Sequence, residues 1–435
     1  MKRASKVVLC TSGSYGDLHP FIAVGLAMQR RGWSVTVAAP SEYEGKIRSE
    51  GLGFHAVGPD YASVASDLGL DVETLWKKTL RPGSGLEFLL RKLYMRYLRR
   101  SYEDLLPATE GADLIVTHFT AFAARLLAEK KRIPWISAVL QPSGFMSAYD
   151  PPVLPMGPFE KLRPLLGEKL YGAAVAPFAR GLTALWTAPV HEMRAELGLP
   201  NSGANPVFEG QFSPYGSIAL YSPEFGAVQP DFPARTTITG FPFYDSEKGG
   251  CCALSPELER FLAAGPPPIV FSLGTAVTAA AGDFYEQSFE AAKALRARAV
   301  FLTGVEGRDP FGGALPPTMF ACRYAPHSQL FARSEAVVHQ GGIGTTAQAL
   351  RAGRPQMIVP FIADQPDNAA RIVRLGAGRT ISRDAYTGRR AAAELSALLD
   401  DPAYSARCAE LGRLIAREDG AARAAEVIDR MFVPA

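Results

Sequence analysis

The chain has 435 residues, of which 47% are hydrophobic, and this length and composition suit a globular protein of two or three domains. The formal net charge of +3 is too small to indicate a nucleic-acid-binding protein. Five cysteines, odd in number and without metal-binding spacing, are typical of a reducing compartment, so we expect a cytoplasmic protein. The apolar run near the basic N-terminus is too short for a signal peptide, and no apolar run reaches the roughly 18 residues of a membrane span.

The first half of the chain alternates apolar strands with helices. Residues 7–10 predict a buried strand, a loop follows, residues 21–28 begin a helix, and residues 33–39 predict the next strand. A strand, a helix and a strand within about 35 residues make a right-handed βαβ unit, so a parallel sheet begins here. Further strands are expected at residues 53–57, 113–117, 135–139 and 219–221.

Two segments of this half allow more than one interpretation. Residues 60–110 are predicted to be mostly helical, and Gly85–Arg100 within them forms a basic amphipathic helix. Such a helix either makes peripheral contact with an anionic membrane or lays its apolar face on its own domain. Residues 141–185 are rich in proline and apolar side chains, which predicts a long irregular segment. It either walls a ligand pocket or is a variable surface excursion.

A second alternating half follows a glycine-rich cluster at residues 246–250. A helix is expected at residues 284–297, and strands are expected at residues 268–272, 298–303, 320–322, 336–338, 355–359 and 378–381. The repeated plan predicts an α/β protein of two doubly wound, Rossmann-like domains facing a cleft. We place the first domain at 1–225, a linker at 226–250, the second domain at 251–415, and a final helix at 416–435 that can pack back on the first domain.

A glycine-rich turn, His339–Thr346, joins a predicted strand to a helix-forming run. Glycines let the backbone approach a ligand, and the helix start behind them offers unpaired N–H groups and the positive end of a dipole. Such a turn can hold a phosphate-like anion, to which His339 can donate a hydrogen bond, or it can be purely structural. Asp364 and Gln365 follow the next strand, where they either bind sugar hydroxyls or serve as a helix N-cap and a surface amide.

The turn and the Asp364-Gln365 pair lie in the stretch from Tyr324 to Ala370, which resembles the nucleotide-sugar signature of family 1 glycosyltransferases, the group of plant and bacterial UDP-glycosyltransferases. The resemblance implies the GT-B fold and an inverting, metal-independent O-glycosyltransferase. Its donor would be a nucleotide diphosphate sugar of the UDP-glucose or dTDP-rhamnose type, and its acceptor a hydroxyl of an apolar small molecule or lipid. No cofactor and no metal are expected, because His339, backbone amides and a helix dipole can meet the charge of the leaving diphosphate.

The same resemblance implies which residues bind the donor. Tyr324 stands where relatives carry a tryptophan that stacks on the base, although it can also belong to the core. Gln348 stands where many members carry a glutamate for the ribose hydroxyls. The implied donor-binding residues are Ser272, Gly274, Thr275, Tyr324, Ala325, His339, Gly341, Gly342, Gly344, Thr345, Gln348, Asp364 and Gln365.

The catalytic base should come from the first half. Many family members carry Gly-His-x-x-Pro in the first loop, whereas Asp17 occupies the position of that histidine here. The acidic partner that relatives place after a later strand is replaced by His118. Either Asp17 is the base with His118 as its partner, or His118 is the base oriented by Asp17. The structural alternatives are a helix cap for Asp17 and a satisfied buried histidine for His118.

The sequence specifies the acceptor less closely than the donor. We expect Tyr15, His19, Gln141 and Phe145 to contact it, and His19 can instead be structural. Over nearly its whole length the chain looks most like the bacterial rhamnosyltransferases that glycosylate hydroxyalkanoyl lipids. Two competing hypotheses are a UDP-sugar 2-epimerase of the same architecture and a non-catalytic partner protein of this fold. The sequence leaves open the sugar, the nucleotide, the acceptor, the linkage atom and the oligomeric state.

Overall fold

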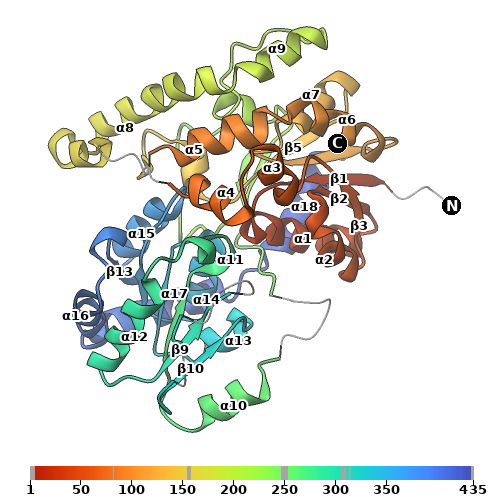
Figure 1. Ribbon diagram of the computed structural model, residues 1–435. Helices are drawn as coiled ribbons and strands as arrows, with labels where there is room; N and C mark the ends of the chain where they lie inside the picture. The colour runs from red at the N-terminus through yellow and green to blue at the C-terminus, as the bar shows by residue number, and fades with distance from the viewer. Residues whose placement is uncertain are drawn as a thin grey trace. The chain divides into compact units, whose positions relative to one another are not determined.

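The computed structural model describes residues 5–81, 83–153, 158–245, 253–304, 310–312 and 315–432 (Figure 1). The chain forms two compact units, each with one parallel sheet. The first unit consists of Met1–Pro152, Met156–Tyr244 and Asp419–Ala435, and the second consists of Val153–Pro155 and Asp245–Glu418. The predicted glycine-rich cluster at 246–250 lies outside the described residues.

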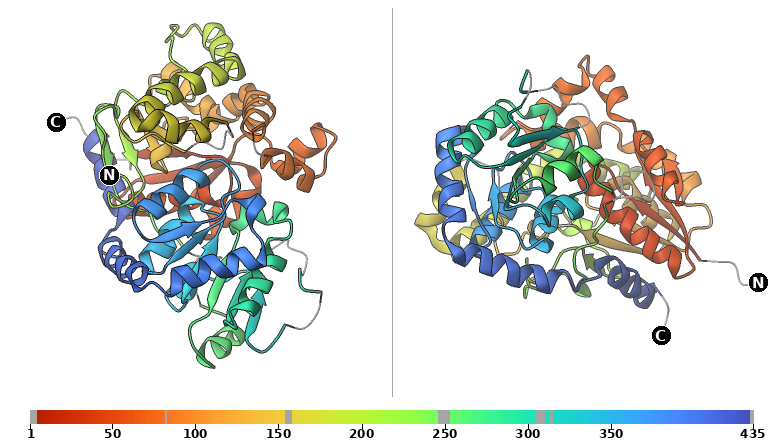
Figure 2. Two further views of the ribbon diagram at one scale, coloured as in Figure 1. Left: turned by 90° about the vertical axis from the view of Figure 1, so that its left-hand side faces the viewer. Right: turned by 90° about the horizontal axis from the view of Figure 1, so that it is seen from below.

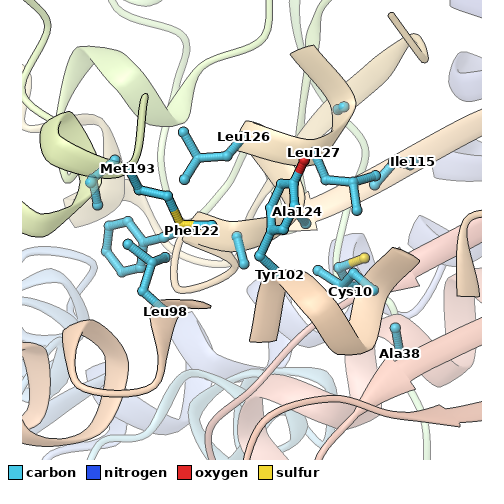
Figure 3. Close-up of a cluster of buried hydrophobic side chains, with 14 of the residues drawn as sticks. Cys10, Ala38, Leu98, Tyr102, Ile115, Phe122, Ala124, Leu126, Leu127 and Met193 are labelled. Carbon is cyan, nitrogen blue, oxygen red and sulfur yellow. The ribbon is translucent and has the colours of Figure 1, made fainter. Parts of the chain in front are cut away.

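The first unit has a seven-stranded sheet in the order β3-β2-β1-β4-β5-β6-β7. Neighbouring strands all pair in parallel, as the repeated strand and helix pattern predicts. The strands are β1 Lys6–Cys10, β2 Ser34–Ala39, β3 Gly53–Ala56, β4 Leu114–His118, β5 Trp135–Val139, β6 Ser217–Ala219 and β7 Thr236–Ile238. Figure 3 shows part of the core between this sheet and its helices, where Ile115, Phe122 and Leu127 are almost fully buried.

The helices of the first unit cover both faces of its sheet (Figures 1 and 2). They are α1 Tyr15–Arg30, η1 Ser41–Tyr43, α2 Glu44–Ser49, α3 Tyr61–Asp67, α4 Val72–Thr79, α5 Gly85–Phe88, η2 Leu89–Met95, α6 Leu98–Ala108, α7 Phe122–Lys131, η3 Pro142–Phe145, α8 Pro158–Trp186, α9 Ala188–Glu196, η4 Glu209–Gln211 and α18 Gly420–Phe432. The C-terminal helix α18 packs against α1, so the end of the chain belongs to the first unit.

The first helix starts earlier than the sequence analysis places it. We predicted a loop up to residue 20, but α1 begins at Tyr15. Ser14 and Asp17 form a capping box. The Asp17 carboxylate accepts a hydrogen bond from the Ser14 N–H, and the Ser14 hydroxyl accepts one from the Gly16 N–H, which fixes the first turn. Pro20 lies inside the helix, where it costs one backbone hydrogen bond. Asp17 is therefore a first-turn residue and not a loop residue.

The prediction of an irregular segment at 141–185 is wrong for its second part. Residues 158–186 form the long helix α8, which is interrupted at Gly167, where φ is 70°. Leucine and alanine are the commonest residues of this stretch, and their helix propensity outweighs the prolines that predict a loop. The first part, up to residue 153, is irregular apart from η3.

The basic amphipathic segment Gly85–Arg100 packs on its own unit. It is divided among α5, the π-helical stretch η2 and the start of α6. Its apolar side chains Leu90, Leu93 and Leu98 are buried, while its basic side chains face solvent. Most of the apolar face that would contact a membrane is thus covered by the protein itself, and Leu86 at its start is exposed.

The second unit has a six-stranded parallel sheet in the order β10-β9-β8-β11-β12-β13. Its strands are β8 Ile269–Ser272, β9 Ala299–Leu302, β10 Met319–Cys322, β11 Ala336–His339, β12 Gln356–Ile358 and β13 Gly378–Thr380. Its helices are α10 Pro256–Ala263, α11 Gly274–Val277, η5 Thr278–Ala280, α12 Phe284–Ala294, α13 His327–Phe331, α14 Ile343–Arg351, α15 Gln365–Arg374, η6 Arg383–Ala385, α16 Gly388–Leu399 and α17 Pro402–Ile415. The predicted fold class, two Rossmann-like α/β units, is confirmed.

Both sheets reverse their strand order once, and these points position the candidate sites. In the first unit the order reverses between β1 and β4, and in the second between β8 and β11. Crossover helices on the two sides of such a point lie on opposite faces of the sheet, which leaves a crevice at the carboxyl ends of the two strands. The residues at these ends are Cys10 and His118 in the first unit, and Ser272 and His339 in the second.

Candidate active site

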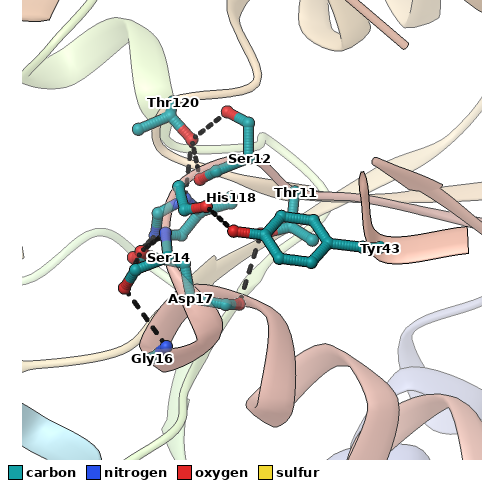
Figure 4. Close-up of polar contacts among 9 residues, drawn as sticks. Thr11, Ser12, Ser14, Gly16, Asp17, Tyr43, His118 and Thr120 are labelled. Atoms are coloured by element: carbon teal, nitrogen blue, oxygen red, sulfur yellow. Dashed lines mark hydrogen bonds and ion pairs between the residues drawn. The ribbon is translucent and has the colours of Figure 1, made fainter. Parts of the chain in front are cut away.

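A polar cluster occupies the switch point of the first unit. The loop after β1 carries Ser12 and Ser14, the first turn of α1 carries Asp17, and His118 ends β4 with Thr120 two residues later. Figure 4 shows these side chains directed toward one another. Asp17 and His118, both predicted site residues, are brought together here by the fold although they lie far apart in the chain.

Asp17 is held by the cap of its own helix. Its Oδ2 accepts hydrogen bonds from the backbone N–H of Ser14 at 2.8 Å and from the Ser14 hydroxyl at 3.2 Å. These bonds direct Oδ1 toward His118, whose Nε2 lies 3.7 Å away. Asp17 therefore serves as part of a helix cap, and this structural role engages its Oδ2 and leaves Oδ1 directed at His118.

The surroundings of the pair change the acidity of both groups. Burial raises the pKa of Asp17 to about 6, against the hydrogen bonds from Ser14, which lower it. Burial, and secondarily the nearby Arg125 guanidinium, lower the pKa of His118 to about 3. At neutral pH the imidazole is therefore uncharged, and the carboxylate titrates within about one unit of neutrality. The shift of Asp17 moves it toward the range in which a general base works best.

Thr120 determines which ring nitrogen of His118 carries the hydrogen. Thr120 Oγ1 lies 2.7 Å from Nδ1 of His118, donates to the Ser12 carbonyl at 3.2 Å and accepts from the Ser12 hydroxyl at 3.1 Å. Because the single Thr120 hydrogen goes to that carbonyl, Nδ1 must donate to Thr120. Nε2 is then the nitrogen with a lone pair, it is buried without a hydrogen-bond partner among the described residues, and it faces Asp17.

An aromatic cluster surrounds the start of α1. The Tyr15 ring lies 5.3 Å from that of His19 and 5.2 Å from that of Tyr43, and His19 lies 4.9 Å from Tyr244. The Tyr43 hydroxyl donates to the Gly13 carbonyl at 2.6 Å and so supports the loop that carries Ser14. The predicted acceptor residues Tyr15 and His19 are thus within one helical turn of Asp17, on the same element.

The other two predicted acceptor residues lie at the end of β5. Gln141 precedes η3, and Phe145 ends it. The Phe145 ring is buried and stacks on Phe232 with centroids 3.9 Å apart, and on Phe212 with centroids 5.6 Å apart. Phe145 therefore packs inside an aromatic stack of the first unit and does not line the cavity described below.

A cavity that is partly open to solvent lies in the first unit beside the polar cluster. It is lined by the ends of β1 and β2 with the loops that follow them, by the segment between β3 and β4, and by the start of α7. Its walls include Ser12, Tyr61, Val64, Leu93, Tyr94, Tyr97, Thr120 and Phe122, and none of the lining residues is charged. The cavity therefore suits an uncharged, largely apolar ligand that carries a few polar groups.

The switch point of the second unit contains an open helix start. Gly342 is the N-cap of α14 and offers no side chain to the first N–H groups of the helix. An alanine Cβ at Gly344 would meet nothing within 4 Å, so the space over this turn is open. Gln340, Thr346 and Gln348 are buried and each has an oxygen without a hydrogen-bond partner among the described residues. Unpaired N–H groups with a dipole end make a site for an anion.

The buried side chain of His339 supports this turn through a hydrogen bond to its backbone. Its Nδ1 accepts a hydrogen bond from the Gly341 N–H at 3.0 Å, so Nε2 carries the ring hydrogen and donates to Oε1 of Gln356 at 2.8 Å. The ring is fully buried, and burial lowers the pKa of His339 to about 4. Both ring nitrogens are engaged, so the donation to a phosphate that we predicted requires one of these bonds to be exchanged.

The Asp364-Gln365 pair lies at the start of α15, beside the glycine turn. Gln365 is buried, and its Oε1 accepts from the backbone N–H groups of Phe361 and Ile362 at 2.8 and 3.0 Å. Asn368 donates from Nδ2 to the Gly341 carbonyl at 2.8 Å and to Asp364 Oδ2 at 2.7 Å. Asn368, which the sequence analysis did not select, thereby joins the glycine turn to the carboxylate.

The remaining predicted donor residues lie around the same end of the sheet. Ser272 ends β8, pairs in register with His339, and is buried. Gly274 adopts a φ of 63°, a left-handed conformation that favours glycine, and a Cβ there would require the Gln340 amide to move. The side chain of Thr275 is outside the described part of the structure. Gly341, Gly342, Gly344, Thr345 and Gln348 belong to the turn and to α14.

Tyr324 is half-buried and is not a core residue. Its hydroxyl donates to Asp245 Oδ1 at 3.3 Å, and Asp245 Oδ2 accepts from the backbone of Ser328. This pair fixes the segment before α13, where Ala325 is buried. A partly exposed face of Tyr324 remains suitable for stacking on a flat ligand.

Sequence reasoning missed the residues that orient the predicted ones. Ser14, Thr120, Gln356 and Asn368 each bond to a predicted site residue. The Ser14-Asp17 spacing is a capping-box pattern and could have been found in the sequence. No local signal identifies Thr120, Gln356 or Asn368, because their partners come from other elements. Among the described residues no cluster of three metal-binding side chains occurs, and no helix is long and apolar enough to cross a membrane.

Comparison with known proteins identifies the family. A model of the C-terminal domain of erythromycin biosynthesis protein CIII-like proteins matches residues 295–431, and a model of the glycosyltransferase family 28 N-terminal domain matches residues 7–148. O-mycaminosyltylonolide 6-deoxyallosyltransferase of Streptomyces fradiae is 32% identical over 432 residues, which cover 98% of this chain and 97% of that protein. Vancomycin aglycone glucosyltransferase of Amycolatopsis orientalis is 29% identical over 435 residues, which cover 97% of each.

Solved structures share the fold. The calicheamicin glycosyltransferase CalG4 superposes with a TM-score of 0.70 at 18% identity, over 99% of this chain and 98% of that one. The glycosyltransferase SnogD of Streptomyces nogalater superposes with a TM-score of 0.67 at 18% identity, over 99% of this chain and 100% of that one. The full-length similarity to the Streptomyces fradiae enzyme, on a fold of two Rossmann-like units, shows that the chain belongs to the family 1 glycosyltransferases of GT-B architecture, related to macrolide and glycopeptide antibiotic glycosyltransferases.

Proposed function

We propose that this enzyme transfers a hexose from a dTDP- or UDP-linked sugar to a hydroxyl of an apolar natural product, with inversion and without a metal. The observation that carries the proposal is the Asp17 carboxylate at the first switch point, with its pKa raised to about 6 and its Oδ1 facing the lone pair of His118 Nε2. A base of this kind is what removal of a hydroxyl proton near neutral pH requires.

The second unit supplies the donor site. The open start of α14 supports binding of a diphosphate, because its N–H groups and dipole favour negative charge. Asp364 and Gln365 are assigned to the sugar, and Tyr324 with Ala325 to the base. A solved relative, the spinosyn rhamnosyltransferase SpnG, is described as complexed with thymidine diphosphate. This supports a dTDP-linked donor here, with UDP as the alternative that the nucleotide panel below decides.

The reaction is a single displacement. The acceptor O–H bond breaks, its oxygen bonds to the anomeric carbon of the sugar, and the bond from that carbon to the diphosphate oxygen breaks. The acceptor proton passes to Asp17 Oδ1, where the Nε2 lone pair of the neutral His118 stabilises the protonated carboxyl. The nucleoside diphosphate leaves with its charge met by the N–H groups at the start of α14 and by its dipole.

Two observations favour Asp17 over His118 as the base. The pKa of His118, lowered to about 3, makes the imidazole a weak proton acceptor at neutral pH. The carboxylate of Asp17 is partly exposed, with 30% of the side chain reached by solvent, whereas His118 is only 1% exposed. A substrate can therefore reach Asp17 directly, and His118 acts as its partner.

The acceptor is assigned to the first unit. Its uncharged cavity beside the polar cluster and the rings of Tyr15 and His19 support an apolar molecule with hydroxyl groups. Relatives named for macrolide and glycopeptide aglycones support a polycyclic or macrocyclic acceptor. A lipid acceptor of the rhamnolipid type is the second candidate, which the burial of most of the apolar face of Gly85–Arg100 does not favour.

The test is a panel of nucleotide sugars and acceptors scored by product mass. UDP-glucose and dTDP-rhamnose are each supplied with macrolide, phenolic and hydroxyalkanoyl acceptors, and donor binding is followed independently by calorimetry with UDP and dTDP. We expect a glycoside with at least one pair, and kcat/KM rising with pH through about 6. Asp17→Asn should lower kcat by about 10²–10⁴-fold and leave nucleotide affinity unchanged.

Three outcomes would oppose the proposal. Conversion of a UDP-sugar without any acceptor would indicate a 2-epimerase. Failure to bind either nucleotide would indicate a non-catalytic protein of this fold. A nearly wild-type rate for Asp17→Asn, with His118→Gln inactive, would transfer the role of base to His118.

A further inference from the structure

The cavity of the first unit has a π-helical wall. The stretch Leu89–Met95 interrupts the helical segment between α5 and α6, and Leu93 and Tyr94 from it line the cavity. A π-helical turn inserts a residue into a helix and thereby changes the direction of its side chains, which is why such turns recur at functional sites. Here the change places a tyrosine beside the loop that carries Ser12.

The Tyr94 hydroxyl belongs to the polar end of the cavity. Burial raises the pKa of Tyr94, the charge of Asp17 raises it further, and hydrogen bonds with the hydroxyls of Ser12 and Thr120 lower it in part. The net shift is upward, so Tyr94 stays protonated and remains a hydrogen-bond donor at physiological pH. Its ring is fixed by Phe122, with centroids 6.1 Å apart.

Two other tyrosines of this unit, Tyr97 and Tyr43, donate their hydroxyl hydrogens to acceptors within the protein. Tyr97, which also lines the cavity, donates to Asp67 Oδ2 at 2.7 Å, and Tyr43 donates to the Gly13 carbonyl at 2.6 Å. The Tyr94 hydroxyl instead has the hydroxyls of Ser12 and Thr120 as its hydrogen-bond partners, and the Tyr94 side chain is only half-buried where it lines the cavity. Because a hydroxyl hydrogen can rotate from one partner to another, Tyr94 can redirect its donor to a ligand oxygen in the cavity.

We propose, building on the proposed function, that Ser12, Tyr94 and Thr120 form a subsite for a second oxygen of the acceptor, close to the hydroxyl that is glycosylated. The acceptor class that fits is an uncharged, flat ring system carrying two neighbouring oxygens. The rings of Tyr61, Tyr97 and Phe122 provide flat apolar walls for its body. Tyr94 donates to the second oxygen, and Ser12 Oγ, which already donates to Thr120, accepts from it.

The experiment measures binding of two matched probes to the full-length protein. 2,3-Dihydroxynaphthalene and 2-naphthol differ by one hydroxyl, and their dissociation constants are measured by calorimetry for the wild type and for Tyr94→Phe. We expect the wild type to bind the diol about three- to tenfold more tightly, the range of one hydrogen bond, and Tyr94→Phe to abolish this preference. The affinity for 2-naphthol should not change, because the ring walls are intact.

Tyr102→Phe is the matched control. Tyr102 lies in the same buried cluster but does not line the cavity, so loss of its hydroxyl should leave the preference for the diol unchanged. Thermal unfolding of each variant shows whether it is folded, and Ser12→Ala tests the subsite from a second residue. Equal binding of the two probes to the wild type, binding of neither, or an equal loss for both in Tyr94→Phe would overturn the subsite. None of these results bears on transfer itself, which the acceptor panel decides separately.

Discussion

The imidazole of His339 and the amide of Gln356 lie with Nε2 and Oε1 2.8 Å apart beneath the glycine turn, and both side chains are fully buried. Together with the Gly341 N–H on Nδ1, this bond fixes the orientation of the ring. The histidine at the head of the turn therefore depends on a residue of the neighbouring strand β12.

Replacing Gln356 should destabilise the second unit. Gln356→Leu leaves the Nε2–H of His339 buried without an acceptor, which costs about 1–3 kcal/mol. Gln356→Glu keeps an oxygen in place and serves as the control. Chemical denaturation measures the free energy of unfolding, and calorimetry measures UDP and dTDP affinity, which should weaken in Gln356→Leu only. Equal stabilities of the two variants would contradict the role of this bond.

Two glycines of the turn should respond differently to alanine. A Cβ at Gly341 would lie 2.7 Å from Ile358 Cγ2, and its φ of 89° disfavours other residues, so Gly341→Ala should cost about 1–3 kcal/mol. Gly344 has open space around it, so Gly344→Ala should fold normally. If a diphosphate occupies that space, Gly344→Ala should nevertheless weaken binding of UDP and dTDP. Unchanged affinity in this variant would remove the diphosphate from the start of α14.

Asp17 should limit stability at neutral pH. Its pKa is about 6 in the folded protein and 3.8 ordinarily, so the folded state holds the proton more tightly than the unfolded chain. Its contribution to stability is therefore greatest at acid pH and is lost as the pH rises through 6. Asp17→Asn, which keeps an oxygen for the Ser14 N–H, should raise the Tm relative to the wild type more at pH 7.5 than at pH 4.5. A constant difference across this range would contradict the raised pKa.

The buried histidines act in the opposite sense. The pKa values of His118 and His339 are lowered to about 3 and about 4, so the unfolded chain takes up protons first as the pH falls below 6.5. Their contribution is complete above pH 6.5 and should fall by about 1.4 kcal/mol per pH unit for each group. The Asp17→Asn background removes the opposing carboxylate, and denaturation between pH 4.5 and 7.5 measures the slope. Adding His339→Gln should reduce the slope by up to about 1.4 kcal/mol per pH unit, the share of one group, and an unaltered slope would argue against a neutral His339.

Much of the fold can be predicted from short-range patterns in the sequence. The parallel sheets and the glycine turn follow from short strands of three to six residues that alternate with helices. At the start of α1, Pro20 favours a loop, whereas the Ser14-Asp17 pattern favours a helix that begins at Tyr15. In residues 158–186, the prolines favour an irregular segment, whereas the residues between them favour a helix. In both places two local signals conflict, and the capping and helix propensities prevailed.

The amino-acid order by itself determined which residues end the strands, since periodicity and glycine positions are local properties of a chain. It therefore placed Asp17, His118, His339 and Asp364 at carboxyl strand ends. Only the tertiary structure decided which atoms of distant elements meet: that the second oxygen of Asp17 faces His118, and that His339 Nε2 donates to Gln356. Hydrogen bonds between elements far apart in sequence form only when the sheet assembles, so no local pattern encodes them.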